Sequence, residues 1–258
     1  MREIILNFHW YELMLWGTVY FLVLYTGCGL INELTIRIMP LIGHGGRLDP
    51  RPHSAGQLRR ELTLSAISIL IFGCGSIIPW GLLRLGWSGL AVQPPWWQIL
   101  LEVVVLILWN EVHFYVNHWL LHTKHLKRFH LAHHQSVVPS PWSTYSFHPV
   151  EASMLGSVLL VPMLLHHFSI QALLTLPVFS IVFNNIGHSN YDFLPDAERD
   201  RWWLNAARRH HLHHACFHGN YGFMFPFMDR LFGTALGPDA AQGQISRFLD
   251  REEAEHAA

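Results

Sequence analysis

The sequence predicts an all-α integral membrane protein, with four to five transmembrane helices and a cytoplasmic, histidine-rich helical cap. Three observations lead to this fold class. Apolar residues make up 51% of the 258 residues and are gathered into blocks of about the length that crosses a bilayer. Basic residues follow every second block. Sixteen of the 20 histidines lie between His113 and His218.

Five apolar blocks occur along the chain. They cover residues 13–31, 62–83, 99–109, 152–168 and 170–186. The first contains no charged residue and is followed by no evident cleavage site, so we expect a retained span. Gly73, Gly75 and Pro79 interrupt the second block, which predicts a kinked or re-entrant segment. The third continues as a helix as far as His118, and the tight connection between the last two predicts a helical hairpin.

Basic residues distinguish the two sides of the predicted membrane. Connections after the first, third and fifth blocks carry lysine or arginine, whereas those after the second and fourth carry almost none. Five spans with the N-terminus outside satisfy the positive-inside rule and place every histidine cluster in the cytoplasm. The C-terminus carries no obvious retention signal, so a bacterial inner membrane is favoured over the endoplasmic reticulum. We expect an N-terminal transmembrane region over residues 1–97, a catalytic domain with three spans and the cap over 98–240, and a polar tail over 241–258.

The histidines are clustered at helical spacing. The clusters are His118 with His122, then His130, His133 and His134, and finally His210, His213 and His214. Residues three and four apart lie on one face of a helix, so each cluster is expected to point one way. Neutral imidazole is a ligand for iron, zinc, copper and nickel. The pattern therefore predicts a metal centre.

The number and kind of these side chains narrow the choice of metal. Eight clustered histidines exceed what one ion can use, so two ions are favoured. Cys28, Cys74 and Cys216 are too scattered for a thiolate site, and few carboxylates accompany the histidines. Calcium, magnesium and iron–sulfur clusters are therefore disfavoured. Iron is preferred to zinc because zinc sites use three or four protein ligands.

The chain resembles the fatty acid hydroxylase/sterol desaturase superfamily of membrane di-iron oxygenases over roughly residues 111–234. The motifs that carry the resemblance are FY (114–115), HWLLH (118–122), FHLAHH (129–134), HPVE (148–151), GHSN (187–190), HHLHH (210–214), GNYG (219–222) and DRLFGT (229–234). The resemblance implies two iron ions, O2 as co-substrate, and hydroxylation or desaturation of an unactivated C–H bond in a sterol, a fatty acyl chain or a related lipid. It also implies a separate electron donor, either cytochrome b5-like or a ferredoxin with its reductase. No side-chain acid or base is required beyond the metal ligands.

The sequence departs from the superfamily pattern at one position. Many relatives carry a histidine four residues before the one that matches His188, and here that residue is Asn184. Asn184 is expected to share a helical face with His188 and to hold a metal-bound water. The resemblance then leaves nine ligands, which are His118, His122, His130, His133, His134, His188, His210, His213 and His214. Supporting positions around the metals are expected at Glu111, His148 and His211.

Four other histidines are not expected to bind metal. His113 is interpreted as a helix-packing residue, His125 as a surface residue, and His166 and His167 as residues of the outer turn of the hairpin. A net charge of −1 gives no indication of nucleic-acid binding.

Two other classes of function fit the sequence less well than an oxygenase. A membrane metal transporter or metal-binding protein would carry ionisable ligands midway along its spans, and the apolar blocks hold almost none at their centres. A zinc-dependent membrane hydrolase would leave most of the histidines unused.

Overall fold

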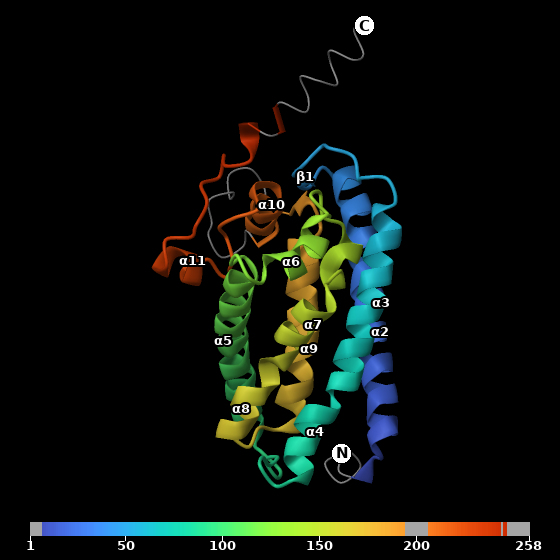
Figure 1. The fold of residues 1–258 in the computed structure, drawn as a ribbon, viewed down its shortest axis with the longest axis vertical. Helices are drawn as coiled ribbons and strands as arrows, with labels where there is room; N and C mark the ends of the chain where they lie inside the picture. The colour runs from blue at the N-terminus through green and yellow to red at the C-terminus, as the bar shows by residue number, and fades with distance from the viewer. Residues whose placement is uncertain (1–6, 194–205, 244, 247–258) are drawn as a thin grey trace, which may run out of the picture.

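The computed structural model describes residues 7–193, 206–243 and 245–246, and in these residues the protein is a bundle of long helices beneath a small cap (Figure 1). One two-stranded sheet is the only sheet in the described residues. The histidine-bearing helices α6 (Lys127–His134) and α10 (Ala206–Cys216) lie at the end of the bundle opposite the N-terminus. The prediction of an all-α fold with a histidine-rich cap is confirmed.

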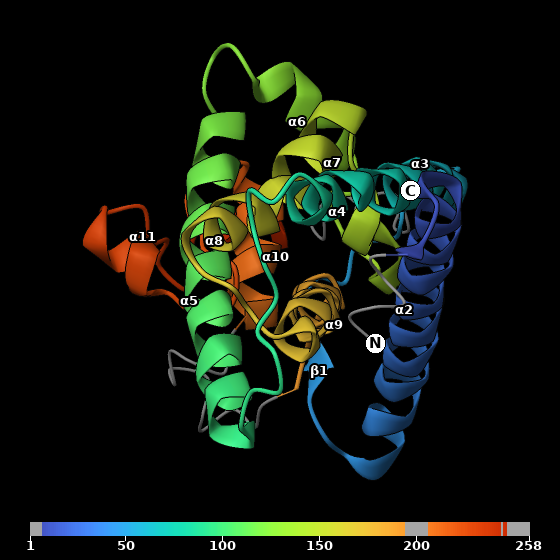
Figure 2. The same ribbon diagram turned by 90° about the horizontal axis from the view of Figure 1, so that it is seen from below.

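Four helical segments in the described residues are long and apolar enough to cross a membrane. They are α2 (Trp10–Ile38) with η1 (Met39–Ile42), α3 (Gln57–Gly75) with α4 (Ile77–Arg84), α5 (Trp96–Leu121) and α9 (Ile170–Gly187). These segments correspond to the first, second, third and fifth apolar blocks. Many of their apolar side chains point outward, as expected for helices whose solvent is lipid. Figure 2 shows them from below, with α9 between α5 and α2.

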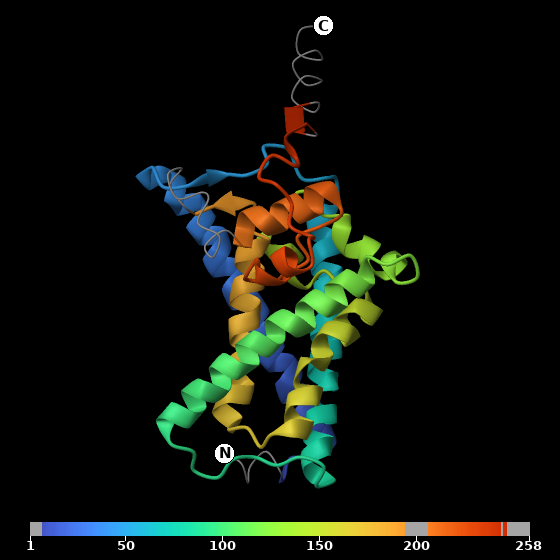
Figure 3. The same ribbon diagram turned by 90° about the vertical axis from the view of Figure 1, so that its left-hand side faces the viewer.

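The second block is kinked and does not turn back. The helix is interrupted at Ser76, whose hydroxyl bonds to the carbonyl of Gly73 at 2.6 Å, and α4 continues in the same direction as α3 (Figure 3). Gly73 also allows α2 and α3 to approach closely, because a Cβ there would lie 2.6 Å from the backbone of Thr18. The second block is therefore a kinked helix and not a re-entrant segment.

The fourth block forms a broken helix. It is divided into α7 (Pro149–Gly156), η3 (Ser157–Leu159) and α8 (Leu160–Leu165). Pro162 supplies no backbone N–H to a continuous helix, which favours this interruption. The indole nitrogen of Trp109 donates to the carbonyl of Val158 at 2.7 Å and holds the broken segment against α5. This block is too short and irregular to count among the four candidate spans.

The N-terminal half of the chain contributes to the cap. Strand β1 (Gly46–Arg47) pairs antiparallel with β2 (Tyr191–Asp192), which follows α9 directly. Gly45 has φ of +70° and passes so close to Asp192 that a Cβ would lie 2.2 Å from its carbonyl oxygen. Close to the site, η2 (Pro141–Tyr145) packs against both α2 and α3. Residues from both expected regions, 1–97 and 98–240, therefore meet around the cap.

Candidate metal centre

The structure brings all nine predicted ligand histidines together in two groups. The five-histidine group contains His118, His122, His130, His134 and His213. The four-histidine group contains His133, His188, His210 and His214. Within each group the nearest ring nitrogens all lie within 4.8 Å of one another. In the part of the chain that the structure describes, no other histidine, cysteine or carboxylate belongs to such a group.

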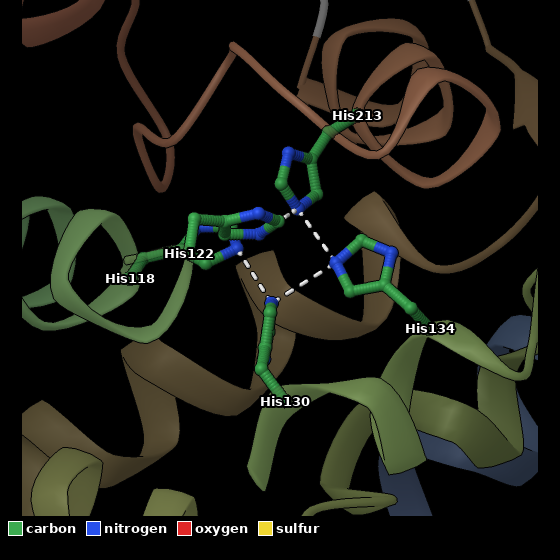
Figure 4. Close-up of side chains that lie close together, drawn as sticks. All are labelled: His118, His122, His130, His134 and His213. Carbon is green, nitrogen blue, oxygen red and sulfur yellow. Dashed lines mark hydrogen bonds between the residues drawn. The ribbon is translucent and has the colours of Figure 1, made fainter. Parts of the chain in front are cut away.

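Helices α5, α6 and α10 and the C-terminal end of α9 supply these side chains. His118 lies in the last turn of α5 and His122 caps its end, while His188 caps the end of α9. Figure 4 shows the five-histidine group, with rings from α5, α6 and α10 converging on one point. Residues far apart in the chain thus meet where the membrane helices end.

Each His-x-x-His-His motif is divided between the two groups. On α6, His130 and His134 belong to the five-histidine group, whereas His133 belongs to the other. On α10 the division is reversed, because His213 alone joins the five-histidine group. Residues i+3 and i+4 lie about 100° apart around a helix, so the last two histidines of a motif diverge. The expectation that each three-histidine cluster points one way is therefore wrong.

Backbone carbonyls determine which ring nitrogen carries the proton in three of the histidines. The Nδ1–H groups of His118, His213 and His188 donate to the carbonyls of Tyr221 (3.0 Å), Gly219 (2.6 Å) and Asn184 (2.7 Å), respectively. A carbonyl only accepts a hydrogen bond, so each Nδ1 must carry the hydrogen. A neutral imidazole has one N–H, which leaves a bare lone pair on Nε2.

These lone pairs point at other imidazole nitrogens. Nε2 of His118 lies 3.2 Å from Nε2 of His130, and Nε2 of His188 lies 3.0 Å from Nε2 of His210. The contacts of His213 are similar. Ligands at right angles around an ion about 2.0–2.1 Å away lie about 3 Å apart, whereas tetrahedral ligands lie about 3.4 Å apart. The separations and the converging lone pairs fit a bound cation with more than four ligands.

Burial keeps these histidines neutral. Burial, together with neighbouring imidazoles and Lys127, lowers the pKa of His122 to about 2, and burial lowers the pKa of His188 to about 4. The pKa values of the histidines of α6 and α10 in the two groups also lie well below the ordinary value, mainly through burial. A metal ligand must be the neutral imidazole, so the site is ready to bind without losing protons at neutral pH.

Asn184 lies beside the four-histidine group. Its side-chain amide donates to the carbonyl of Thr144 at 3.1 Å, and its backbone carbonyl orients His188. It also lines a cavity of about 10 Å³ together with His133, His188 and His210. Such a cavity has room for about one water molecule. The role of Asn184 in holding a water stays a prediction.

The other three expected supporting residues do not touch the ligand nitrogens. Glu111 accepts the backbone N–H groups of Met224 and Phe225 and so holds the loop that follows Tyr221. His148 caps the start of α7 through the N–H of Val150. His211 is buried, with its Nε2 3.8 Å from a carboxylate oxygen of Asp49. Their influence on the groups is therefore indirect.

Two carboxylates support the site more directly. Glu151 lies 2.7 Å from Nδ1 of His130 and is fully buried. Asp229 accepts the N–H groups of Tyr221 and Gly222, and thereby holds the carbonyl that orients His118. Both lie within the motifs that carry the superfamily resemblance, which was the signal available for them.

The four histidines not expected to bind metal lie outside both groups. His113 contacts the hydroxyl of Ser157 at 3.1 Å, between α5 and η3, and His125 is exposed. His166 pairs with Glu102 at 3.3 Å, near the opposite end of α5, and His167 is the next residue. These placements agree with their interpretation as packing, surface and outer-turn residues.

Comparison with known proteins identifies the family. The fatty acid hydroxylase family matches residues 103–234, about half of the chain, and this segment contains all nine histidines. The chain belongs to the fatty acid hydroxylase family. The predicted resemblance to the wider fatty acid hydroxylase/sterol desaturase superfamily is confirmed.

The relatives of this fatty acid hydroxylase family member include a sterol desaturase, a methylsterol monooxygenase and an aldehyde decarbonylase. It is 26% identical to a Delta(7)-sterol 5(6)-desaturase of Candida glabrata, over 95% of this chain and 66% of the relative. It is 28% identical to methylsterol monooxygenase 1 of Rattus norvegicus, over 62% and 55%. A very-long-chain aldehyde decarbonylase of Oryza sativa subsp. indica is 31% identical, over 55% and 54%.

The chain spans about half to two thirds of the length of these relatives. No solved structure matches it significantly.

Proposed function

We propose that the protein is a membrane-bound non-haem di-iron oxygenase, which hydroxylates or desaturates an unactivated C–H bond of a lipid with O2 and external electrons. The observation that carries this proposal is the convergence of nine imidazoles, eight of them buried and that of His122 half-buried, in two groups whose neighbouring Nε2 atoms lie about 3 Å apart. Family membership and the names of the relatives support a lipid-modifying oxidoreductase.

The arrangement favours two iron ions over other metals. Five histidines in one group exceed the three or four protein ligands of zinc sites, and the printed nitrogen separations in that group, 3.0–3.2 Å, are shorter than the about 3.4 Å of tetrahedral ligands. Imidazole also suits iron as a ligand. The proposed ligands are the nine histidines of the two groups, five for one ion and four for the other.

The iron pair would supply reductive activation of O2 for C–H oxidation. For hydroxylation the balance is RH + O2 + 2e⁻ + 2H⁺ → ROH + H2O, and desaturation takes two hydrogens from the substrate and yields two waters. The electrons come from a separate donor protein, cytochrome b5-like or a ferredoxin. The chain itself orients the imidazoles through the carbonyls of Tyr221, Gly219 and Asn184 and excludes water by burial.

Apolar side chains favour a substrate that arrives from the bilayer. Phe114 lies one turn before His118 on α5, and with Leu121, Phe147 and Leu155 it lines the small cavity beside the histidines. The cavity of about 10 Å³ is far smaller than a lipid, so these side chains must move to admit a chain or ring. A sterol, a fatty acyl chain or a related lipid fits this apolar surface.

The proposal places the site on the cytoplasmic face, supported by the basic residues that follow alternate apolar blocks. A transporter is disfavoured because both groups lie at helix ends, away from the middle of every candidate span.

The test is the metal content of the purified protein, with oxygen uptake on addition of a reductant and a lipid extract. We expect iron, and O2 consumption that depends on both additions. Zinc in place of iron, full turnover under nitrogen and a hydrolysed product would together refute the oxygenase.

A further inference from the structure

The short helix α11 (Phe227–Leu231) and the residue after it expose three large apolar side chains, while a carboxylate is buried beneath them. Phe227 is 38%, Leu231 71% and Phe232 60% exposed, whereas Asp229 is only 1% exposed. Met228 is buried as well, and Arg230 is the one charged side chain of the helix that is exposed. Large apolar side chains gathered on a surface mark contact with another apolar phase or partner.

The position of this turn beside α5 indicates which phase it contacts. The ring of Phe232 stacks on Tyr115 of α5, with centroids 5.4 Å apart, and Figure 1 shows α11 next to the cap end of that helix. Tyr115 lies six residues before the end of α5, or about 9 Å along the axis. Neighbouring side chains of α5, such as Val116 and Leu108, are also exposed and apolar. Because α5 is a candidate span, this shared surface is continuous with its lipid-facing side.

The buried carboxylate connects the turn to the histidine site. Asp229 accepts N–H groups of Tyr221 and Gly222 at 2.7 and 2.8 Å, and the hydroxyl of Thr234 at 2.7 Å. The carbonyl of Tyr221 in turn accepts the Nδ1–H of His118. The depth of the turn and the orientation of one imidazole are thus set by the same few hydrogen bonds.

We propose that residues 227–232 are inserted into the boundary between headgroups and acyl chains, beside α5, with bilayer lipid as their occupant. Side chains of interfacial helices reach about 5–10 Å into this boundary, which matches the level of Tyr115 on α5. The inserted turn anchors the loop that carries Tyr221 to the membrane surface. The inference does not depend on the metal or on the proposed reaction.

Accessibility of a nitroxide label tests the insertion. Leu231→Cys is labelled in proteoliposomes of phosphatidylcholine and phosphatidylglycerol, in a background with Cys28, Cys74 and Cys216 replaced by serine. Gly237→Cys is the matched aqueous reference, since Gly237 is exposed and a Cβ there meets nothing within 4 Å. Leu108→Cys reports the lipid face of α5. We expect the ratio of O2 to nickel-chelate accessibility at residue 231 to be several-fold above that at 237 and close to that at 108.

Two results would overturn the proposal. A ratio at residue 231 equal to that at 237 would place the turn in water. Low accessibility to both O2 and the nickel chelate would mean that a second copy or another protein covers it.

A second experiment uses the unaltered chain, in case the cysteine-free background does not fold. A phospholipid with a diazirine on a carbon near the headgroup end of one acyl chain is photoactivated in the same vesicles, and the adducts are mapped by mass spectrometry. Cleavage after Arg230 puts Leu231 and Phe232 at the start of a peptide that is separate from α5, and fragment spectra place the adduct within it. We expect adducts at Leu231 or Phe232 and none over residues 237–243, and their absence from the turn while α5 is labelled would contradict the insertion.

Discussion

The histidines of this site differ in the group that contacts Nδ1, the ring nitrogen that faces away from the proposed metals. His118, His188 and His213 are oriented by backbone carbonyls, which any residue type supplies. His130 is oriented by the carboxylate of Glu151, so its support depends on a side chain. Groups that orient ligating imidazoles are typically worth 10–100-fold in metal affinity.

Replacement of Glu151 is therefore expected to weaken one metal site selectively. Glu151→Ala leaves Nδ1 of His130 without its partner, and the affinity of the five-histidine group should fall about 10–100-fold. Glu151→Gln keeps an acceptor oxygen and should lose much less. Titration of the metal-free protein with Fe²⁺ under nitrogen measures both. Equal affinities of Glu151→Ala and the unaltered protein would show that the carboxylate does not orient the ring.

Adjacent histidines on α6 are expected to affect different metals. His133→Ala should empty the four-histidine group, and His134→Ala should weaken the five-histidine group, because the two side chains diverge. Iron per chain should fall from about two towards one in His133→Ala, because the four-histidine group then keeps only three ligands and binds its ion more weakly. Mössbauer spectra of the two variants should differ in which iron signal is lost. His166→Ala is the control and should keep its full metal content, because His166 contacts Glu102 and lies outside both groups. Equal losses of iron in His133→Ala and His166→Ala would contradict the assignment of the nine histidines to two metal-binding groups.

Among the elements, α2 and α3 approach each other closely at Gly73. A side chain at Gly73 would collide with the backbone of Thr18, which cannot move as a side chain would. Gly75, two residues later in the same helix, faces open space. The pair separates the effect of close packing from the general effect of glycine on a helix.

Gly73→Ala is expected to destabilise the protein, while Gly75→Ala is expected to be neutral or slightly stabilising. Forcing atoms into a packed contact costs typically about 1–3 kcal/mol, whereas alanine is favoured over glycine in a helix by roughly 0.5–1 kcal/mol. Thermal unfolding in detergent, followed by circular dichroism, measures both. The same midpoint for the two variants would mean that α2 and α3 are not in close contact.

The whole molecule concentrates buried, neutral histidines, and this makes its stability depend on pH. Burial lowers the pKa of His188 to about 4 in the folded protein, against about 6.5 in an unfolded chain. Between these values the unfolded chain binds a proton that the folded chain does not, so the stability rises with pH. The other histidines of the cap act in the same direction because burial lowers their pKa values too.

The metal-free protein should accordingly unfold at a lower temperature at about pH 5 than at about pH 7.5, with little change between about pH 7.5 and 8.5. Scanning calorimetry in detergent at these three values measures the midpoint. A midpoint that stays constant or rises on acidification would contradict the burial of neutral histidines.

Much of this organisation was predictable from local features. Apolar blocks indicated the four candidate spans, and histidine spacing with the family motifs indicated the nine clustered residues. The division of each His-x-x-His-His motif was not predictable, because it depends on how α6 and α10 face each other across the site. The hydrogen bonds from histidine Nδ1 to the carbonyls of Gly219, Tyr221 and Asn184 could not be predicted either, because every residue type has a backbone carbonyl. Pro162 indicated an interruption of the fourth block, but the extent of the interruption depends on tertiary contacts such as the hydrogen bond from Trp109 to the carbonyl of Val158.

Both histidine groups include residues of α10, which among the described helices is the last histidine-bearing one to leave the ribosome. While translation is still short of residue 210, only His133 and His188 of the four-histidine group exist, and the five-histidine group lacks His213. The nascent polypeptide therefore enters the bilayer without a complete ligand set of either kind. Under the proposed function, the complete pair of iron sites can form only after residue 214 has been synthesised.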